Sequence, residues 1–157
     1  MRELYICADN VHERLNEILN NKLALPFEIL KTDNGKPYIE GNPLHFSISH
    51  SGDRGLIAIS DKPIGVDIEI FKDKLRKSVI ERFSAREQAE IADERDFLIH
   101  WTAREAYIKL YGLTIAKMWK RVEFFGGNIY VDGQLSSVKI RHYYFTFGIA
   151  AICTEIA

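Results

Sequence analysis

The sequence of 157 residues contains only two cysteines and four prolines, and its formal net charge at pH 7 is −1. A charge so close to zero gives no global basic field, which argues against DNA or RNA as the main partner. No apolar run approaches the length of a membrane span, so we expect no membrane partner. The first ten residues turn polar too soon for a signal peptide. Cys7 and Cys153 lie in separate apolar stretches, which favours buried free thiols in a reducing cytoplasm.

The composition is that of a soluble globular protein, with 46% apolar and 27% charged residues. The length fits one domain over residues 1–157, or two small halves that share one core. Near the N-terminus, Leu4–Ala8 reads as a short strand. Apolar residues then recur at helical spacing from 11 to about 21, and Asp9 or Asn10 can cap this predicted helix.

Three strands are predicted in the middle of the chain, separated by turns: Phe46–Ser51, Leu56–Ser60 and Ile64–Ile70. In the third of these, IGVDIEI, polar and apolar residues alternate. Because residues two apart on a strand point to the same face, Asp67 and Glu69 share one face and the apolar side chains take the other.

The second half of the chain follows a charged segment at residues 71–77, the weakest seam in the sequence. Helical patterns cover 76–83, 84–92 and 94–111, and strand patterns cover 121–131 and 137–153. Gly112 is a natural stop for the last helix, and Asp132 and Gly133 form a turn. The order of strands, helices and strands indicates an α+β fold rather than a doubly wound sheet.

The pair Asp67 and Glu69 is the first candidate site. Two neighbouring carboxylates repel each other unless a positive group lies between them. A hard divalent cation such as Mg²⁺ meets that need with oxygen ligands. An ordinary polar strand face is the competing interpretation, and the alternation alone does not separate the two.

The segment WTAREAYIK supplies the second candidate. On a helix, Trp101, Glu105 and Lys109 follow one another at intervals of one turn and share a face. Glu105 can give a third oxygen to a metal while Lys109 reaches a phosphate. A plain salt bridge between Glu105 and Lys109 is the alternative on this segment alone.

Two further segments offer polar groups to an anion. The strand FSISHS ends by exposing Ser49 and His50, which suits a phosphate contact, although a structural Ser-His turn is equally consistent with it. A Ser/His catalytic dyad is disfavoured because adjacent strand residues point to opposite faces. Lys36, in the rigid turn GKP, can aim an ammonium at an anion or remain an exposed turn lysine. The other histidines are interpreted as structural or exposed: His12, His45, His100 and His142.

Taken in order, the motifs GKP, FSISHS, GVDIE, RFSxxE and WTxREAxxK resemble those of the 4'-phosphopantetheinyl transferases. The spacing is most similar to the pseudodimeric type that activates surfactin synthetase, with a shortened N-terminal region. This resemblance implies two similar α+β halves, about 1–70 and 71–157, packed as an intramolecular pseudodimer. It also implies one complete site in a monomer, because the metal strand and the Glu105 helix lie on opposite sides of the seam.

The activity implied by the resemblance is transfer of the 4'-phosphopantetheine arm of coenzyme A to a serine of an acyl or peptidyl carrier protein. The other product is adenosine 3',5'-bisphosphate. By similarity, Asp67, Glu69 and Glu105 would hold Mg²⁺, and Glu105 would also be the base for the carrier serine. Lys109 would lie near the pyrophosphate. The remaining residues implied to bind coenzyme A are Lys36, Ser49, His50 and Arg104.

Two departures from the family pattern stand out. Arg104 occupies a position where the family helix usually has lysine, and arginine has a different contact geometry. The segment before Gly35 is short and offers no match to the arginine that binds adenine-side phosphates in larger members. A weakly active or inactive relative that binds coenzyme A or a carrier is therefore the second hypothesis, and an unrelated metal-dependent phosphohydrolase is the third. Phe71–Lys77 and Lys117–Arg121 are candidate carrier-docking patches.

Overall fold

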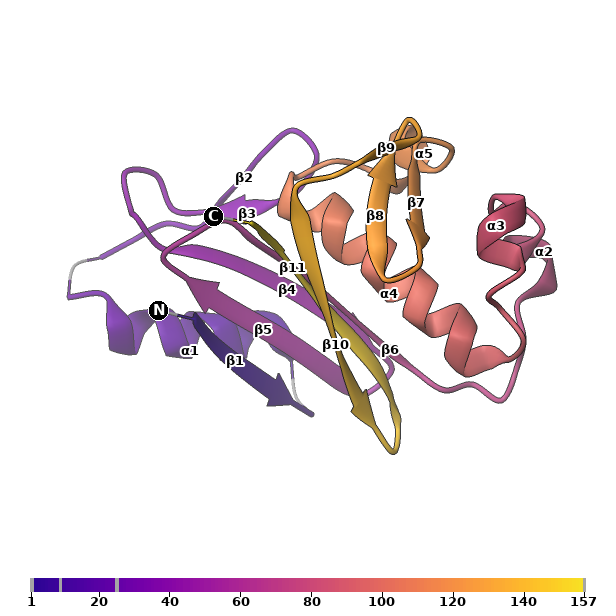
Figure 1. Cartoon of the computed structure of the whole chain (residues 1–157). Coiled ribbons are helices and arrows are strands. Elements are labelled where there is room, and N and C mark those ends of the chain that lie inside the picture. The colour runs from indigo at the N-terminus through magenta and orange to yellow at the C-terminus, as the bar shows by residue number, and fades with distance from the viewer. Residues whose placement is uncertain (1, 9, 25, 157) are drawn as a thin grey trace.

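The computed structural model describes residues 2–8, 10–24 and 26–156. Two three-stranded antiparallel sheets lie against each other, and each carries one long helix on its outer side (Figure 1). The first sheet has the order β1-β5-β4 and the helix α1; their bounds are Arg2–Cys7, Arg54–Ser60, His45–Ser51 and Val11–Lys22. The second has the order β10-β11-β6 and the helix α4; their bounds are Val138–Phe145, Gly148–Glu155, Ile64–Ile70 and Glu94–Leu110.

These two units repeat one topology. Each runs strand, helix, strand, strand, and in each the last of the three strands pairs with both of the others. The predicted α+β fold of two similar halves is confirmed. On this topology the boundary falls at residues 61–63, between β5 and β6, a few residues before the division expected near residue 70. The reason is that β6 pairs with β11 rather than with the first sheet, from Ile64↔Thr154 to Ile70↔Gly148.

Helix α1 forms where its apolar periodicity predicts. The Asn10 side chain caps it by accepting from His12 N and Glu13 N at 3.0 and 3.4 Å. Asp9, the other predicted cap, lies outside the described residues. The buried face of the helix packs on β4 and β5 and consists of Val11, Leu15, Ile18 and Leu19. Each such side chain stabilises the fold by roughly 1.5–3 kcal/mol through burial.

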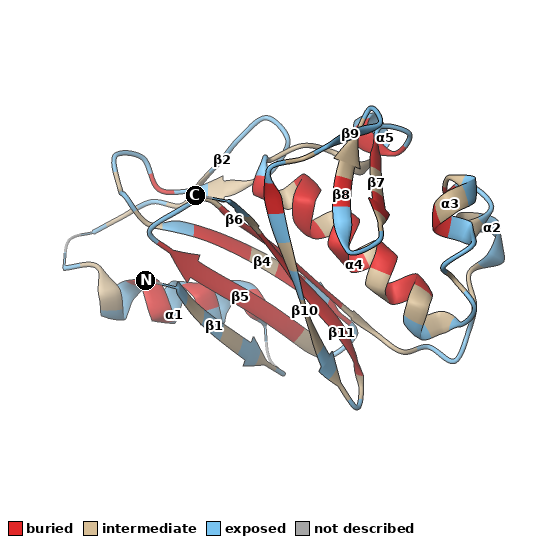
Figure 2. Ribbon diagram, in the orientation of Figure 1, coloured by how far each residue is buried: buried red, intermediate tan, exposed pale blue. Residues whose placement is uncertain are grey.

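The core between the two sheets is made by strand faces that point away from the helices. Leu56 and Ala58 of β5 pack against Val66 and Ile68 of β6 and against Ile152 of β11. Figure 2 shows the central strands and most of α4 in the colour of buried residues. The apolar face predicted for IGVDIEI is therefore the face that joins the two halves.

The segments outside this repeat are short. They comprise β2 Leu30–Lys31, β3 Pro37–Tyr38, α2 Lys77–Ile80, α3 Ala85–Gln88, α5 Ile115–Met118, β7 Val122–Phe125, β8 Asn128–Val131 and β9 Gln134–Leu135. The predicted helices at 76–83 and 84–92 are reduced to single turns. Within the described residues, no helix combines the length and apolarity needed to cross a membrane.

Two predicted strands are in fact hairpins. The range 121–131 folds back at Gly126 and Gly127, whose φ angles are 55° and 79°. Glycine adopts this left-handed region at little cost, and it closes the turn between β7 and β8. The range 137–153 likewise divides into β10 and β11. By contrast, Gly112 has φ 61° just after α4, as expected for a helix stop.

Candidate active site between the two halves

Asp67 lies on β6 at the edge that faces β4, and it is buried. Its Oδ1 accepts hydrogen bonds from Ser49 Oγ and from Lys109 Nζ, both at 2.7 Å. Its Oδ2 is also buried and has no hydrogen-bond partner among the described residues. Because an unpaired buried carboxylate oxygen is costly, this atom is a good candidate for binding a cation.

Glu69 lies two residues further along β6, on the same face as Asp67. Its Oε2 accepts from Ser51 Oγ at 2.7 Å and lies 3.9 Å from the Arg76 guanidinium. The expectation that Asp67 and Glu69 share a face is therefore met, with each carboxylate held by a serine of β4.

Helix α4 brings the third carboxylate over this strand. Between Phe97 and Leu110 its partly exposed side chains are Ile99, Trp101, Glu105 and Lys109, and the rest are buried. The close approach of helix and strand depends on Gly65, because a Cβ atom there would lie 2.0 Å from the carbonyl oxygen of Ala106. Asp93 starts the helix by accepting from Asp96 N at 2.9 Å.

The carboxylates influence each other's protonation. Burial, and next the charge of Asp67, raise the pKa of Glu105 to about 7, against the opposing effect of Lys109. Burial also raises the pKa of Asp67, which Lys109 and Ser49 oppose. Glu105 thus changes protonation state near neutral pH, which suits a general base.

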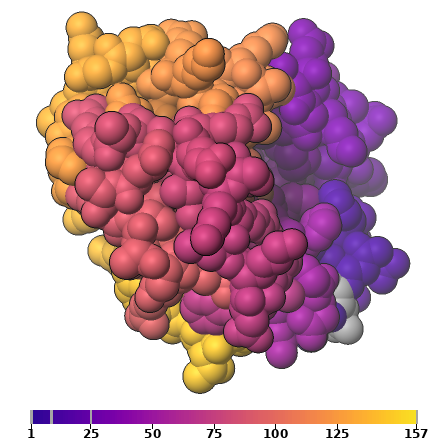
Figure 3. Space-filling model, turned by 90° about the vertical axis from the view of Figure 1, so that its right-hand side faces the viewer, coloured from indigo at the N-terminus to yellow at the C-terminus, as the bar shows by residue number. Residues whose placement is uncertain are grey.

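Two cavities meet at these residues. The first, of about 400 Å³, is lined by His12, Ile48, Ser49, His50, Asp67, Glu69, Trp101, Glu105 and Lys109. The second, of about 590 Å³, shares His12, Ile48, Glu105 and Lys109 and continues past Lys36 toward Ile115. Figure 3 shows this side of the molecule hollowed between the purple N-terminal segments and the magenta-to-orange later ones.

Two of the residues predicted to bind coenzyme A, His50 and Lys36, lie at different cavities. His50 is exposed at the first cavity. Lys36 lines the second cavity and donates from Nζ to the carbonyl oxygen of Leu110, so its turn packs on the end of α4. Burial lowers the pKa of Lys36. His12, which the sequence indicates as structural or exposed, lines both cavities. The sequence of one helix could not show which segments lie opposite it.

A metal would need the three carboxylates together. Among residues 2–8, 10–24 and 26–156, no three His, Cys, Asp or Glu side chains already have the arrangement of a metal site. The side chains of Asp67, Glu69 and Glu105 nonetheless fit a hard cation, because each would donate a carboxylate oxygen. Asp67 Oδ2 is buried and has no hydrogen-bond partner among the described residues.

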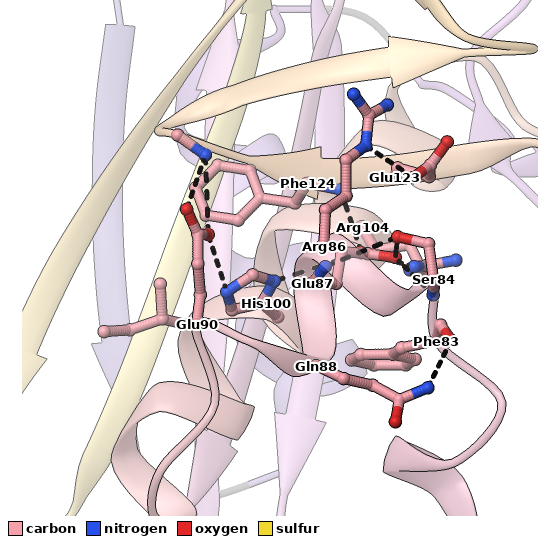
Figure 4. Close-up of polar contacts among 12 residues, drawn as sticks. Phe83, Ser84, Arg86, Glu87, Gln88, Glu90, His100, Arg104, Glu123 and Phe124 are labelled. Carbon is pink, nitrogen blue, oxygen red and sulfur yellow. Dashed lines mark hydrogen bonds and ion pairs between the residues drawn. The ribbon is translucent and has the colours of Figure 1, made fainter.

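Arg104 lies away from both cavities and is 1% exposed. Its guanidinium donates to Glu87 Oε1 and lies over the ring of Phe83 (Figure 4). It also donates to the carbonyl oxygen of Trp119. Glu87 is fully buried and also accepts from Phe124 N at 3.0 Å. This geometry gives Arg104 a structural contact between α4, α3 and β7 and does not support the predicted contact with a cofactor.

We expect Glu87→Gln to destabilise the fold by about 3 kcal/mol, because it leaves the buried Arg104 charge uncompensated. Burial alone would raise the pKa of Glu87, but His100, Arg104 and Phe124 N outweigh it and lower the pKa to about 2. The folded pKa is below the unfolded one, so this stabilisation is present above about pH 4.5 and is lost as pH falls toward 2. Urea unfolding at several pH values measures both effects.

The control for this variant is Glu123→Gln. Glu123 pairs with Arg86 at 2.9 Å, but the side chains are 20% and 36% exposed. Partly exposed pairs stabilise by less than about 1 kcal/mol. Equal destabilisation by the two variants would contradict the assignment of Glu87 as the central buried ion.

A sequence model of the 4'-phosphopantetheinyl transferase superfamily matches residues 63–148, more than half of the chain. The chain belongs to this superfamily. The match covers the second topological unit from the start of β6 as far as the first residue of β11, and it includes the three carboxylates and Lys109. The family predicted from the ordered motifs is confirmed.

Curated members of the superfamily are similar over a longer range. The chain is 38% identical over 113 residues to the 4'-phosphopantetheinyl transferase psf-1 of Bacillus pumilus, covering 65% of this chain and 48% of that protein. The transferase Sfp of Bacillus subtilis strain 168 is 32% identical over 109 residues, covering 65% and 47%. AcpT of Salmonella typhi is 35% identical over 105 residues, covering 60% and 55%. The chain spans about half the length of these relatives, and the likeness to psf-1 and Sfp supports the predicted type.

Proposed function

We propose that the chain transfers the 4'-phosphopantetheine arm of coenzyme A to a serine of an acyl or peptidyl carrier protein. The observation that carries this proposal is the convergence of Asp67, Glu69, Glu105 and Lys109 in one cavity at the junction of the two halves. The relatives named as 4'-phosphopantetheinyl transferases support the same reaction. We also propose that the enzyme is a monomer, because residues of both halves, from His12 to Lys109, line this one cavity.

In the proposed reaction the carrier serine oxygen forms a bond to the β-phosphorus of coenzyme A. The bond from that phosphorus to the leaving adenosine 3',5'-bisphosphate breaks. Asp67, Glu69 and Glu105 would hold Mg²⁺, which when bound neutralises charge that builds on the pyrophosphate oxygens. Lys109 adds a second positive charge at that point, and Glu105 accepts the proton of the serine hydroxyl.

The second, larger cavity is proposed to take the nucleotide side of coenzyme A. It adjoins Glu105 and Lys109, and Lys36 lines it. His50 at the first cavity is proposed to contact a phosphate, as the resemblance implies. The segment Phe71–Lys77, which follows β6 directly, is the proposed carrier-docking patch because its basic residues would attract an acidic carrier helix. A cytoplasmic location is likewise a proposal.

Incubation with coenzyme A, Mg²⁺ and a panel of apo-carrier proteins tests this function. We expect at least one fatty-acid, polyketide or nonribosomal-peptide carrier to gain the mass of one phosphopantetheinyl group, measured by intact mass spectrometry. Omission of Mg²⁺ should abolish the gain. If no carrier gains mass but calorimetry detects coenzyme A binding, the chain is a non-catalytic relative; cleavage of coenzyme A without a carrier would instead indicate a phosphohydrolase.

A further inference from the structure

The edge strands of the two sheets, β4 and β6, meet without pairing through their backbones. Strand β6 pairs with β11 along one edge, and its other edge faces a row of serines on β4. Three backbone N–H groups of β6 donate to these serine hydroxyls: Val66 to Ser47 at 3.1 Å, Ile68 to Ser49 at 3.3 Å and Ile70 to Ser51 at 3.3 Å. We call the three buried serines the serine ladder. Their hydroxyls accept hydrogen bonds from N–H groups that have no backbone partner on this edge of β6.

Two members of the serine ladder do more than join the strands. Ser49 Oγ donates its proton to Asp67 Oδ1, and Ser51 Oγ donates its proton to Glu69 Oε2, both at 2.7 Å. A hydroxyl has one proton and two acceptor positions. Ser49 Oγ also accepts from Lys109 Nζ at 2.9 Å, in addition to the bond from Ile68 N. Its hydrogen-bonding capacity is therefore used inside the protein, which leaves none for a phosphate of coenzyme A.

Ser47 is the ladder member without a carboxylate. Ser49 accepts from Ile68 N and bonds the side chain of the preceding residue, Asp67. Ser51 does the same with Ile70 N and Glu69. Ser47 accepts from Val66 N, and the residue before Val66 is Gly65. Ser47 therefore makes the same bond to the β6 backbone as the other two serines, but it contacts no carboxylate, because glycine has no side chain. A substitution of Ser47 removes a contact between the halves without affecting a carboxylate, so it is the control for substitutions of Ser49 and Ser51.

We propose that Ser49 and Ser51 are positioning residues that fix the Asp67 and Glu69 carboxylates in the orientation that binds a divalent cation. This inference rests on the proposed function and changes the role of Ser49 from nucleotide contact to support of a metal ligand. The hydroxyls act because a carboxylate held by a short, charge-assisted hydrogen bond loses less conformational freedom when it binds the ion. The same hydroxyls tie the metal strand to the first half of the molecule.

Titration with Mn²⁺ alone, followed by the electron paramagnetic resonance signal of the free ion, tests the proposal. We expect Ser49→Ala and Ser51→Ala to weaken Mn²⁺ binding by about tenfold or more, as loss of a group that orients a ligand typically does. Ser47→Ala should bind Mn²⁺ as the wild type does, although urea unfolding should show all three variants destabilised. Ser51→Thr, which keeps the hydroxyl, should restore the affinity.

Equal Mn²⁺ affinity in Ser47→Ala and Ser51→Ala would overturn the proposal and leave the serine ladder a purely structural feature. A wild-type chain that does not bind Mn²⁺ would overturn it as well. The titration needs neither coenzyme A nor a carrier, so its outcome is separate from that of the transfer assay. A chain whose Mn²⁺ affinity depends on Ser49 and Ser51 as expected, but which modifies no carrier, would lose the proposed function and keep this inference.

Discussion

Asp67→Ala is expected to lower kcat/KM for phosphopantetheinyl transfer by at least about a thousandfold. The substitution removes both the buried oxygen proposed to bind Mg²⁺ and the partner of Lys109 at 2.7 Å. Without Asp67 the Lys109 ammonium loses its carboxylate partner and keeps the hydrogen bond to Ser49 Oγ at 2.9 Å. Rates of carrier modification at saturating and limiting coenzyme A, measured by intact mass, separate loss of chemistry from loss of binding.

Asp67→Asn separates the effect of the negative charge of Asp67 from the effect of the size and shape of its side chain. Its amide oxygen can still accept from Ser49, but it has no charge with which to hold a cation, so we expect activity almost as low as that of Asp67→Ala. Asp132→Asn is the matched control, since Asp132 pairs with Arg121 on an exposed turn and both side chains are 55% exposed. Full activity of Asp67→Ala would refute the metal assignment.

Local periodicity was enough to predict the parts of the site that lie on one element. Alternation put Asp67 and Glu69 on one face of β6, and helical spacing put Glu105 and Lys109 on one face of α4. Both placements are confirmed because these periods depend only on backbone geometry. That the two elements meet was not a local signal, and it came from the ordered motifs. The structural reason for the contact is Gly65, where the helix backbone fills the space of a side chain.

The parts that sequence reasoning missed depend on distant partners. Arg104 was assigned to the cofactor because it stands where the family helix usually has lysine, but its charge is met by Glu87, seventeen positions away. The serines of FSISHS gave a visible alternation, yet their partners on β6 could not be known before the strands were placed. The hairpin at Gly126 and Gly127 had a local signal in the paired glycines, which the prediction of a strand over 121–131 did not use.

Glu105→Gln is expected to lower kcat by about a hundredfold to ten-thousandfold, since general-base catalysis contributes that much. Glu105 is proposed to be both a metal ligand and the base, and glutamine removes only the second role completely: its amide oxygen can still approach a cation, but it cannot accept the serine proton. The decisive measurement is the dependence of kcat on pH rather than its value at one pH.

A base must be deprotonated to act, so the wild-type rate should rise with pH through the pKa of Glu105. That pKa is about 7 without a cation, and a bound Mg²⁺ moves it lower because positive charge favours the carboxylate. Glu69→Gln, the control, should be slow but keep this rise, because Glu69 is proposed only as a ligand. Glu105→Gln should lose the rise altogether. If both variants keep the same pH dependence, Glu105 is a ligand and the proton leaves through another group.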